Sequence, residues 1–229
     1  RSPRKIGPST HERAIRVHTP LVLPGSAFRP PGTREPLLDQ PDRWPAFHPL
    51  IIAHDVGRSR DRSTAVVGGG SPFQSGVVGL CGFEELPIGL YGSPRANALA
   101  AVDRTYRNNA LIVVDLSNDA SYLETLYDTF GPRLIGLQIT HRGDGMSPER
   151  RPVRNGSVLV YSVGRSYLIE RFHAQLVAGQ VRFAKSAASQ RAYGQLEALQ
   201  IELRESGQIY SCLPGQHDDL GMSCCMLAF

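Results

Sequence analysis

Hydrophobic positions show no periodicity over residues 1–47 and then recur as short apolar runs from Leu50 onward. Residues 1–47 are rich in Pro and Arg, and segments such as PLVLPG and FRPPGTREP cannot form a long helix or a central strand. We therefore predict a linker or a surface-draped arm over residues 1–47, followed by one folded domain over residues 48–229. Because the chain begins with Arg1 rather than Met, a fragment of a longer protein is one interpretation.

Five apolar runs in this domain have the length and composition of buried strands. The second and third runs are separated by a Gly-rich turn and are predicted to pair as a hairpin. The run ALIVVDLS is the clearest of the five. The predicted strands cover residues 50–57, 63–70, 75–86, 110–117 and 133–140.

Two segments between these strands are predicted to be helical. One covers residues 93–108, with Ser93 as the N-cap and a Pro at the first helical position. The other covers residues 119–130 and is ended by Gly131 and the Pro that follows it. Residues 141–157 are polar and basic, and they are predicted to form a loop or a flexible hairpin.

The C-terminal part is predicted to be helical. Three amphipathic or apolar segments cover residues 165–179, 189–205 and 217–229, and Gly179 is the predicted C-cap of the first. In the second segment, apolar residues fall on one helical face: Ala192, Leu196, Leu199 and Leu203. Strands interspersed with helices and followed by helices predict an α/β fold, a mixed central sheet flanked by helices.

Composition and cysteine content limit the class of protein. Hydrophobic residues make up 41% and charged residues 20%, as in ordinary globular proteins. No apolar run approaches the roughly 18–20 residues of a membrane span, and no N-terminal stretch resembles a secretory signal. The four cysteines match no zinc-binding spacing and are predicted to be buried free thiols: Cys81, Cys212, Cys224 and Cys225.

The kind of basic residue is more informative than the net charge of +4. Lys5 and Lys185 are the only lysines, so 23 of the 25 basic residues are Arg. A guanidinium group binds phosphate through two parallel hydrogen bonds, which favours a nucleic-acid partner. A GC-rich genome would produce the same bias.

Acidic residues stand at the carboxyl ends of two predicted strands. Asp55 ends the run LIIAHD and Asp115 ends ALIVVD, so neighbouring parallel strands would bring both to the sheet edge where α/β proteins bind ligands. A further pair, Asp218 and Asp219, opens the last predicted helix. Packed carboxylates repel each other and favour hard cations such as Mg²⁺ or Mn²⁺, which can hydrolyse a phosphodiester as a pair. The alternative is that all four are ordinary turn and N-cap residues.

Several motifs, taken in order, resemble one known family. The C-terminal segments are VGRSYLIERFHAQLVAGQVRF, AYGQLEALQIEL and GQHDDLGMSCCMLAF; IIAHDVGRSRDRSTAVVGG and LIVVDLSNDASYLETL precede them. Together they resemble the nuclease domain of the large terminase subunit of tailed bacteriophages and prophages, which has a ribonuclease-H-like fold. The resemblance covers roughly residues 48–229.

This resemblance implies roles for the acidic residues. Asp55 and Asp115 match the first and second metal ligands of the family, and Asp218 or Asp219 matches the third, with Asp219 slightly favoured. Asp61 matches an auxiliary acid that follows the first ligand. The implied cofactor is Mg²⁺ or Mn²⁺, in a two-metal site.

Other positions match or depart from the family. His217 matches a residue that assists proton transfer or contacts phosphate, and Arg165 matches a basic residue that contacts phosphate. Where relatives carry Asp and Ala on the last helix, this chain has Met222 and Ser223, which argues against a fourth acid there. No G-x-x-x-x-G-K-[ST] loop occurs, so the family's ATPase half is missing from this chain.

The expected function is cleavage of double-stranded DNA during viral genome packaging, in the host cytoplasm. The implied partners are an ATPase domain, a small terminase subunit and the portal. Two alternatives stay open: a junction resolvase of the RuvC kind, and an inactive DNA-binding remnant of a prophage. The predicted DNA-contacting residues lie in two basic segments, whose alternative interpretation is solvated loops: Arg58, Arg60 and Arg62, and Arg142, Arg150, Arg151 and Arg154.

Overall fold

The structure is a computed structural model. It describes residues 48–57, 61–71, 75–106, 109–117, 119–141, 145–184, 186–204, 207–212 and 217–229, and the backbone of Thr19–Pro20. Apart from those two residues, the predicted arm over residues 1–47 lies outside the described part of the chain. Its role as a linker stays a prediction.

A mixed eight-stranded sheet forms the centre of the domain, in the order β7-β8-β6-β5-β2-β3-β4-β9. Strands β8, β6, β5 and β2 run parallel, β2, β3 and β4 form an antiparallel meander, and β7 is antiparallel to β8. This topology confirms the predicted mixed α/β sheet. The strands are β2 (Leu50–Asp55), β3 (Thr64–Gly70), β4 (Val78–Glu85), β5 (Leu111–Asp115), β6 (Leu134–Thr140), β7 (Met146–Val153), β8 (Gly156–Gly164) and β9 (Val181–Phe183).

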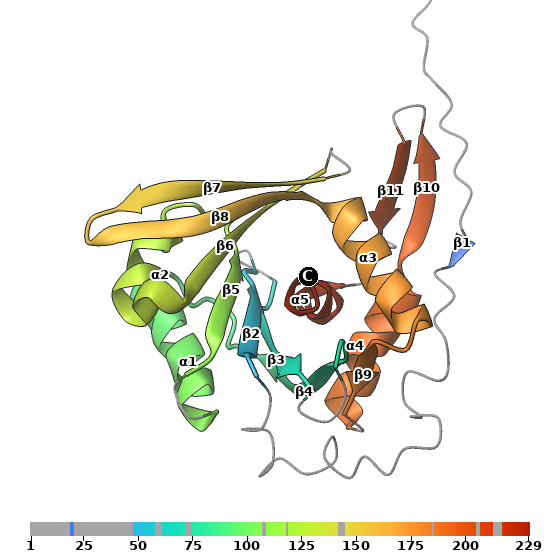
Figure 1. Ribbon diagram of the computed structural model, residues 1–229, viewed down its shortest axis with the longest axis horizontal. Coiled ribbons are helices and arrows are strands. Elements are labelled where there is room, and N and C mark those ends of the chain that lie inside the picture. Colours follow the sequence, from blue (N-terminus) through green and yellow to red (C-terminus); the bar gives the residue numbers. More distant parts are fainter. Residues whose placement is uncertain are drawn as a thin grey trace, which may run out of the picture.

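Helices cover both faces of this sheet (Figure 1). The sheet separates two hydrophobic cores, and the adjacent residues Ile52 and Ala53 of β2 point into different ones. One face carries α1 (Gly92–Thr105) and α2 (Tyr122–Phe130), followed by the 3-10 turn Gly131–Arg133. The other carries α3 (Arg165–Val177), α4 (Ala187–Glu197) and α5 (Asp219–Leu227).

A small second sheet lies beside α3 (Figure 1). It has the order β1-β10-β11, from β1 (Thr19–Pro20), β10 (Gln200–Arg204) and β11 (Gly207–Ser211). The prediction of one helix over 189–205 is therefore wrong in its second half. Helix α4 ends at Glu197, and the chain from Gln200 pairs antiparallel with β11 instead.

The basic segment 141–157 was predicted as a loop or a flexible hairpin, and the structure agrees with the hairpin. It contains β7, which pairs with β8 along its whole length from Met146–Val163 to Val153–Gly156, so it is an ordered hairpin rather than a loop. Strand β7 is the edge of the large sheet. Prolines within a strand are tolerated at an edge, where no second neighbour needs their missing N–H, and β7 contains Pro148 and Pro152.

Two helix ends test the capping predictions. Helix α1 begins at Gly92 with Tyr91 at the N-cap position, so the prediction of Ser93 as the N-cap is wrong. Gly131 ends α2 as predicted, with a positive φ of 57°. The C-cap of α3 is Ala178 rather than the predicted Gly179, which follows it with a φ of 70°.

The most buried helix is α5, which lies in the centre of the domain with α3 and α4 beside it (Figure 1). Its buried Ser223 forms a hydrogen bond of 2.8 Å with the hydroxyl of Thr64 on β3. The Thr64 hydroxyl also donates to the carbonyl oxygen of Asp219, at 3.0 Å. The departure from the family at position 223 thus provides an anchor between the helix and the sheet.

We predict that Ser223→Ala lowers the free energy of unfolding by about 1–2 kcal/mol, because Thr64 loses a buried partner. Ser93→Ala is the matched control: this serine is exposed within α1 and should change stability by less than about 0.5 kcal/mol. Urea denaturation monitored by circular dichroism measures both. A loss at Ser93 as large as that at Ser223 would contradict both the assigned anchor and the observed start of α1.

Candidate active site

Two aspartates meet at the carboxyl edge of the large sheet. Strands β2 and β5 are parallel neighbours in which His54 pairs with Val114, so Asp55 and Asp115 follow at the next position of the register. Strand β3 runs antiparallel to β2 on its other side, and its Thr64 pairs with Asp55. The two strand-end carboxylates are therefore brought together by strand pairing, as the sequence predicts.

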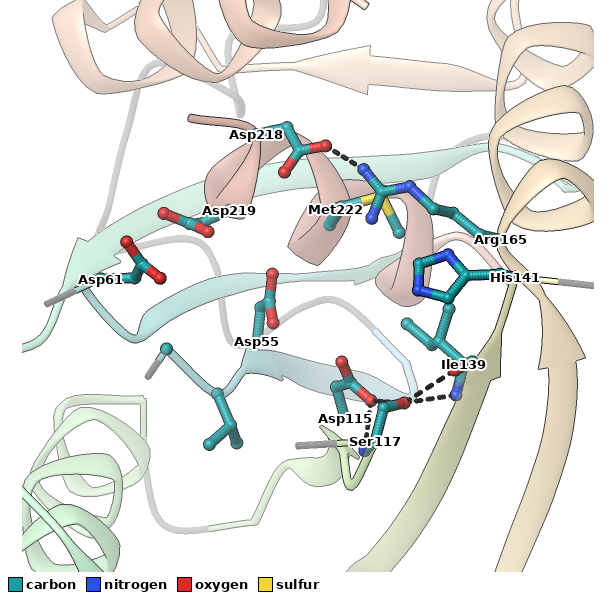
Figure 2. Close-up of a pocket in the computed structure, with 12 residues that line it drawn as sticks. Asp55, Asp61, Asp115, Ser117, Ile139, His141, Arg165, Asp218, Asp219 and Met222 are labelled. Carbon is teal, nitrogen blue, oxygen red and sulfur yellow. Dashed lines mark hydrogen bonds and ion pairs between the residues drawn. The ribbon is translucent and has the colours of Figure 1, made fainter. Parts of the chain in front are cut away.

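Helix α5 adds acidic residues from the far end of the chain. Asp218 stands at its N-cap position and Asp219 is its first residue, but Asp218 makes no side-chain cap hydrogen bond. With Asp55, Asp61 and Asp115, both line one pocket of about 330 Å³ (Figure 2). The ordinary N-cap interpretation of this pair therefore fails for Asp218, whose carboxylate faces an arginine instead.

Hydrogen bonds hold Asp115 in place. Its Oδ1 accepts from the backbone N–H of Ser117 at 2.8 Å and from the Ser117 hydroxyl at 2.5 Å. The same hydroxyl oxygen accepts from the N–H of Ile139 on β6, at 2.6 Å. Ser117, which no sequence pattern indicated, thus connects the acid to the neighbouring strand.

An ion pair holds Asp218. The guanidinium of Arg165, the first residue of α3, pairs with its carboxylate, and Arg165 Nε donates to the carbonyl of Tyr210 at 3.4 Å. Figure 2 shows Asp218 turned toward Arg165, whereas the carboxylates of Asp55 and Asp115 face the pocket. Arg165 therefore lies at the acidic site, where the resemblance implies a basic residue.

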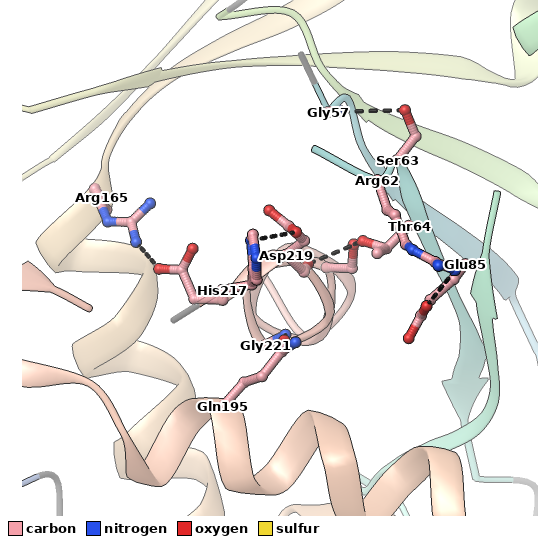
Figure 3. Close-up of polar contacts among 12 residues, drawn as sticks. Gly57, Arg62, Ser63, Thr64, Glu85, Arg165, Gln195, His217, Asp219 and Gly221 are labelled. Carbon is pink, nitrogen blue, oxygen red and sulfur yellow. Dashed lines mark hydrogen bonds and ion pairs between the residues drawn. The ribbon is translucent and has the colours of Figure 1, made fainter. Parts of the chain in front are cut away.

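The start of α5 is fixed to the rest of the domain (Figure 3). The N–H of Gly221 donates to the side chain of Gln195 on α4 at 3.0 Å, and the Asp219 carbonyl accepts from Thr64. His217 is 61% exposed, and its Nδ1 lies 3.9 Å from a carboxylate oxygen of Asp219. Two hydrogen bonds thus hold the helix start, and the histidine is exposed to solvent.

Mutual repulsion and burial disfavour ionisation of the acids. Burial raises the pKa of Asp55 well above its usual range, and the charges of Asp115, Asp219 and Asp218 raise it further. Burial likewise raises the pKa of Asp115, and burial together with Asp218 raises the pKa of Asp219 to about 6. A cation among these groups would relieve the repulsion.

The donor set fits a hard divalent cation, because carboxylate oxygens are the preferred ligands of Mg²⁺ and Mn²⁺. In the described part of the chain, however, no three His, Cys, Asp or Glu side chains converge closely enough to hold an ion. Asp115 is turned toward Ser117 and Asp218 toward Arg165. These carboxylates would have to rotate from their present partners to complete a ligand set.

The other predicted site residues are distributed unevenly. Arg62 does not line this pocket; it lines a second one with His217 and Asp219, and it forms an ion pair with Glu85, at 3.0 Å. Arg58, Arg60 and Arg142 lie outside the described residues. His141 lines the pocket and was not predicted, although its position directly after β6 repeats the placement of acids at the ends of β2 and β5.

The basic residues of the β7–β8 hairpin lie away from the acidic pocket, along the edge of the sheet. Strand β8 has 9 residues and ends next to Arg165, so its start lies roughly 25 Å from that edge at about 3.3 Å per residue. At the tip, the N–H of Arg154 donates to the Glu124 carboxylate of α2, and Asn155 contacts Asp128. The arginines of this segment therefore lie on a paired strand and its turn, and their contact with DNA stays a prediction.

The mixed central sheet flanked by helices is shared with solved terminase nuclease domains. The large terminase nuclease from thermophilic phage G20c is similar with a TM-score of 0.55 at 19% identity, over 78% of this chain and 80% of that one. A magnesium-bound structure of that nuclease is similar at 18% identity over 78% of this chain and 79% of that one, also with a TM-score of 0.55.

A second phage protein has the same fold. The large terminase (g2p) nuclease domain from bacteriophage SPP1, with bound Mn, has a TM-score of 0.50 at 12% identity, over 82% of this chain and 89% of that chain. No family model and no curated protein matches this sequence. At these identities the likeness establishes the fold. In the described part of the chain, no helix has the length and apolar character needed to span a membrane.

The acidic site predicts a pH dependence of stability in the presence of chelator. A raised pKa means that the folded protein binds a proton that the unfolded chain has already released. Stability contributed by protonated Asp219 is therefore full below about pH 4 and is lost as the pH rises through about 6. Asp219→Asn removes this titration, so its stability relative to the unmodified protein should increase across that window.

Urea denaturation at intervals between about pH 4 and pH 8 measures the difference in the free energy of unfolding. Asp128→Asn, an exposed position on α2, is the control and should give a difference that is constant with pH. A flat difference for Asp219→Asn would show that this carboxyl does not titrate abnormally.

Proposed function

We propose that this protein is a divalent-metal-dependent endonuclease that cleaves double-stranded DNA, as the nuclease domain of a phage or prophage packaging terminase. One observation carries the proposal: three acidic elements far apart in the sequence, ending β2 and β5 and beginning α5, line a single pocket on this fold. The likeness to terminase nucleases with bound Mg or Mn supports the same chemistry.

Asp55, Asp115 and Asp219 would hold the metal ions, with Asp218 and Asp61 at the rim of the set. Mg²⁺ or Mn²⁺, when bound, would supply an activated water and stabilise the charge on the leaving oxygen. Ser117 orients Asp115 through two hydrogen bonds and so limits the positions that this carboxylate can take. Arg165 holds Asp218 and places a positive charge beside the pocket, where it would contact the scissile phosphate.

Two histidines lie near the acids. His141 lines the pocket from the end of β6, and His217 contacts Asp219 from the solvent side. Either imidazole could pass a proton to or from solvent during hydrolysis, because histidine exchanges protons near neutral pH. His141 is the better placed of the two, since His217 does not line the pocket.

The DNA partner must approach an acidic pocket that repels phosphate, so basic side chains must flank it. Arg165 lines the acidic pocket, and Arg62 lines a second pocket together with Asp219. The β7 arginines, Arg150 and Arg151, with Arg154 at the tip, would contact a duplex farther along the sheet edge. Charged residues and prolines also protect an edge strand against pairing with another chain, which is the competing explanation for β7.

Assembly with further components belongs to the same proposal. An ATPase domain, a small terminase subunit and a portal would complete a packaging machine around this nuclease. The host cytoplasm would be its location.

Plasmid cleavage tests the proposed chemistry. We expect cleavage with Mn²⁺ or Mg²⁺ and none in excess chelator. Asp55→Asn and Asp115→Asn should each reduce the cleavage rate at least about 100-fold, because each removes a charged ligand. Asp128→Asn, on the exposed side of α2, should cleave at the unmodified rate.

Full cleavage by both ligand variants, or full cleavage in chelator, would refute the nuclease mechanism. A four-way junction offered beside linear duplex distinguishes the two enzyme classes. Preference for the junction would indicate a resolvase. Metal binding without cleavage of either substrate would indicate an inactive DNA-binding remnant.

DNA binding has a separate test. Replacing Arg150, Arg151 and Arg154 together by Ala should weaken binding to every duplex sequence alike, because phosphate contacts carry no sequence information. Each lost phosphate contact should flatten the slope of log affinity against log salt by about 0.9. Fluorescence anisotropy in chelator, across a salt series, measures the slope.

Arg104→Ala is the control for this test, since Arg104 is exposed near the end of α1. An unchanged slope in the triple variant would show that β7 does not touch DNA. The arginines would then be explained by protection of the sheet edge.

A further inference from the structure

Arg95 is a buried arginine on α1 that does not line the acidic pocket. Its side chain is 3% exposed. Its guanidinium lies between two aromatic rings, 5.4 Å from the centroid of Tyr91 and 5.2 Å from that of Tyr122. Burying a charged group is unfavourable unless its partners compensate, and an apolar residue of similar volume would often serve packing as well. The partners of Arg95 therefore call for a specific explanation.

The polar contacts of Arg95 reach three separate loops. Nε donates to the carbonyl oxygen of Leu90 at 2.9 Å, in the connection between β4 and α1. Nη2 donates to the carbonyl oxygen of Gly57 at 3.4 Å, and Nη1 lies 3.7 Å from a carboxylate oxygen of Asp119. Gly57 is two residues beyond Asp55, and Asp119 is four residues beyond Asp115. One guanidinium thus joins the two loops that follow the strand-end acids.

The loop after Asp55 is already constrained at Gly57. Its N–H donates to the hydroxyl of Ser63 at 3.1 Å. A Cβ at this position would lie 2.5 Å from backbone atoms of Asp61 and Arg62, so the turn closes tightly on itself. Gly57 therefore makes hydrogen bonds through both its N–H and its carbonyl, and it connects Arg95 to the end of β2.

Asp119 gives the corresponding connection on the β5 side. Its carbonyl accepts from the N–H of Tyr122 at 3.2 Å, and its carboxylate accepts from Ser121 at 2.6 Å. The residue therefore fixes the start of α2 while it provides the charge that compensates Arg95. The ring of Tyr122 completes the contact by packing against the guanidinium.

We propose that Arg95 is a positioning residue that holds the loops after Asp55 and Asp115 in one arrangement, from the face of the sheet opposite α5. The expected effect of Arg95 on metal affinity rests on the proposed function. The connection that Arg95 makes between the two loops is independent of that function. Arg95 touches neither substrate nor metal ligand in this account, and it acts through Gly57 and Asp119.

A second Arg–Asp pair, in which Asp103 is buried and Arg133 is 27% exposed, provides a control. Arg133 Nη2 lies 2.9 Å from the carboxylate of buried Asp103, and Arg133 Nη1 donates to the carbonyl of Ala110 at 2.8 Å. Ala110 precedes β5, so this pair stands at the opposite end of the parallel strands. Arg133→Met should destabilise the fold without disturbing the acidic site.

The experiment compares Arg95→Met, Arg95→Lys and Arg133→Met in the full chain. Amide hydrogen exchange is measured at Gly57 and Ser117, which lie in the two loops, and Mn²⁺ affinity is measured by calorimetry. Arg95→Met should exchange faster at both amides and bind Mn²⁺ on the order of 10–100-fold more weakly, the range for groups that orient ligands. Arg95→Lys, with one nitrogen in place of three, should recover only part of either loss.

Cleavage kinetics add a readout that general destabilisation does not move. Arg95→Met should lower kcat with little change in the KM for plasmid DNA, because Arg95 does not line the pocket. Arg133→Met should leave Mn²⁺ affinity, kcat and both amides unchanged at a comparable loss of thermal stability. If Arg95→Met fails to fold, Asp119→Asn replaces it, because that side chain is 30% exposed and its loss leaves the sheet intact.

Equal behaviour of the Arg95 and Arg133 variants in exchange and Mn²⁺ affinity would overturn the proposal. Loops that loosen without any change in Mn²⁺ affinity would also overturn it, since Arg95 would then serve only the fold. If the unmodified protein binds no Mn²⁺, the proposed function fails. The connection between the loops is then judged by exchange alone, and unchanged exchange at Gly57 and Ser117 refutes it.

Discussion

Repulsion between like charges in a partly dehydrated pocket is the constraint on which the rest of this structure depends. Asp55 and Asp115 are brought together by strand pairing, and α5 brings Asp218 and Asp219 to the same place. Without a cation, burial and the neighbouring charges raise the pKa of Asp55 well above its usual range. The fold must therefore provide enough stabilisation elsewhere to keep the acids together, and the site gains most from binding a positive charge.

The stabilisation comes from the elements on both sides of the sheet. Helix α5 is buried and held through the Ser223–Thr64 hydrogen bond, so its acidic start cannot move away from β2. On the other face, Arg95 contacts the loop after β2 and faces Asp119 in the loop after β5. The Ser223–Thr64 hydrogen bond on one face and the contacts of Arg95 on the other thus counteract the repulsion between the acids. The pocket lies between these two sets of contacts.

Much of this arrangement could be predicted from local patterns, because apolar runs and the acids at their ends are local signals. The five predicted strands, the strand-end positions of Asp55 and Asp115, and the last helix follow from such runs, whereas strand β8, which lies between β6 and β7, was not predicted. For strand β7 a loop and a hairpin both stayed open, since its prolines and charges are typical of loops and only its place at the sheet edge makes them compatible with a strand. Strand β10 was hidden because Leu196, Leu199 and Leu203 fit a helical repeat, whereas pairing with β11 decides the structure. Arg95 and Ser117 carry no local signal, because their roles depend on contacts between distant segments.

Thermal unfolding with and without Mn²⁺ tests the central claim most directly, because a cation that binds only the folded site must stabilise it. At about 100 times the dissociation constant the stabilisation should be about 2.7 kcal/mol. For a domain of this size that corresponds to a rise in Tm of roughly 5–10 °C. Asp55→Asn should have a higher Tm than the unmodified protein in chelator and should lose most of the rise with Mn²⁺. A Tm that Mn²⁺ leaves unchanged, or an equal rise in the variant, would show that the acidic pocket is not a metal site.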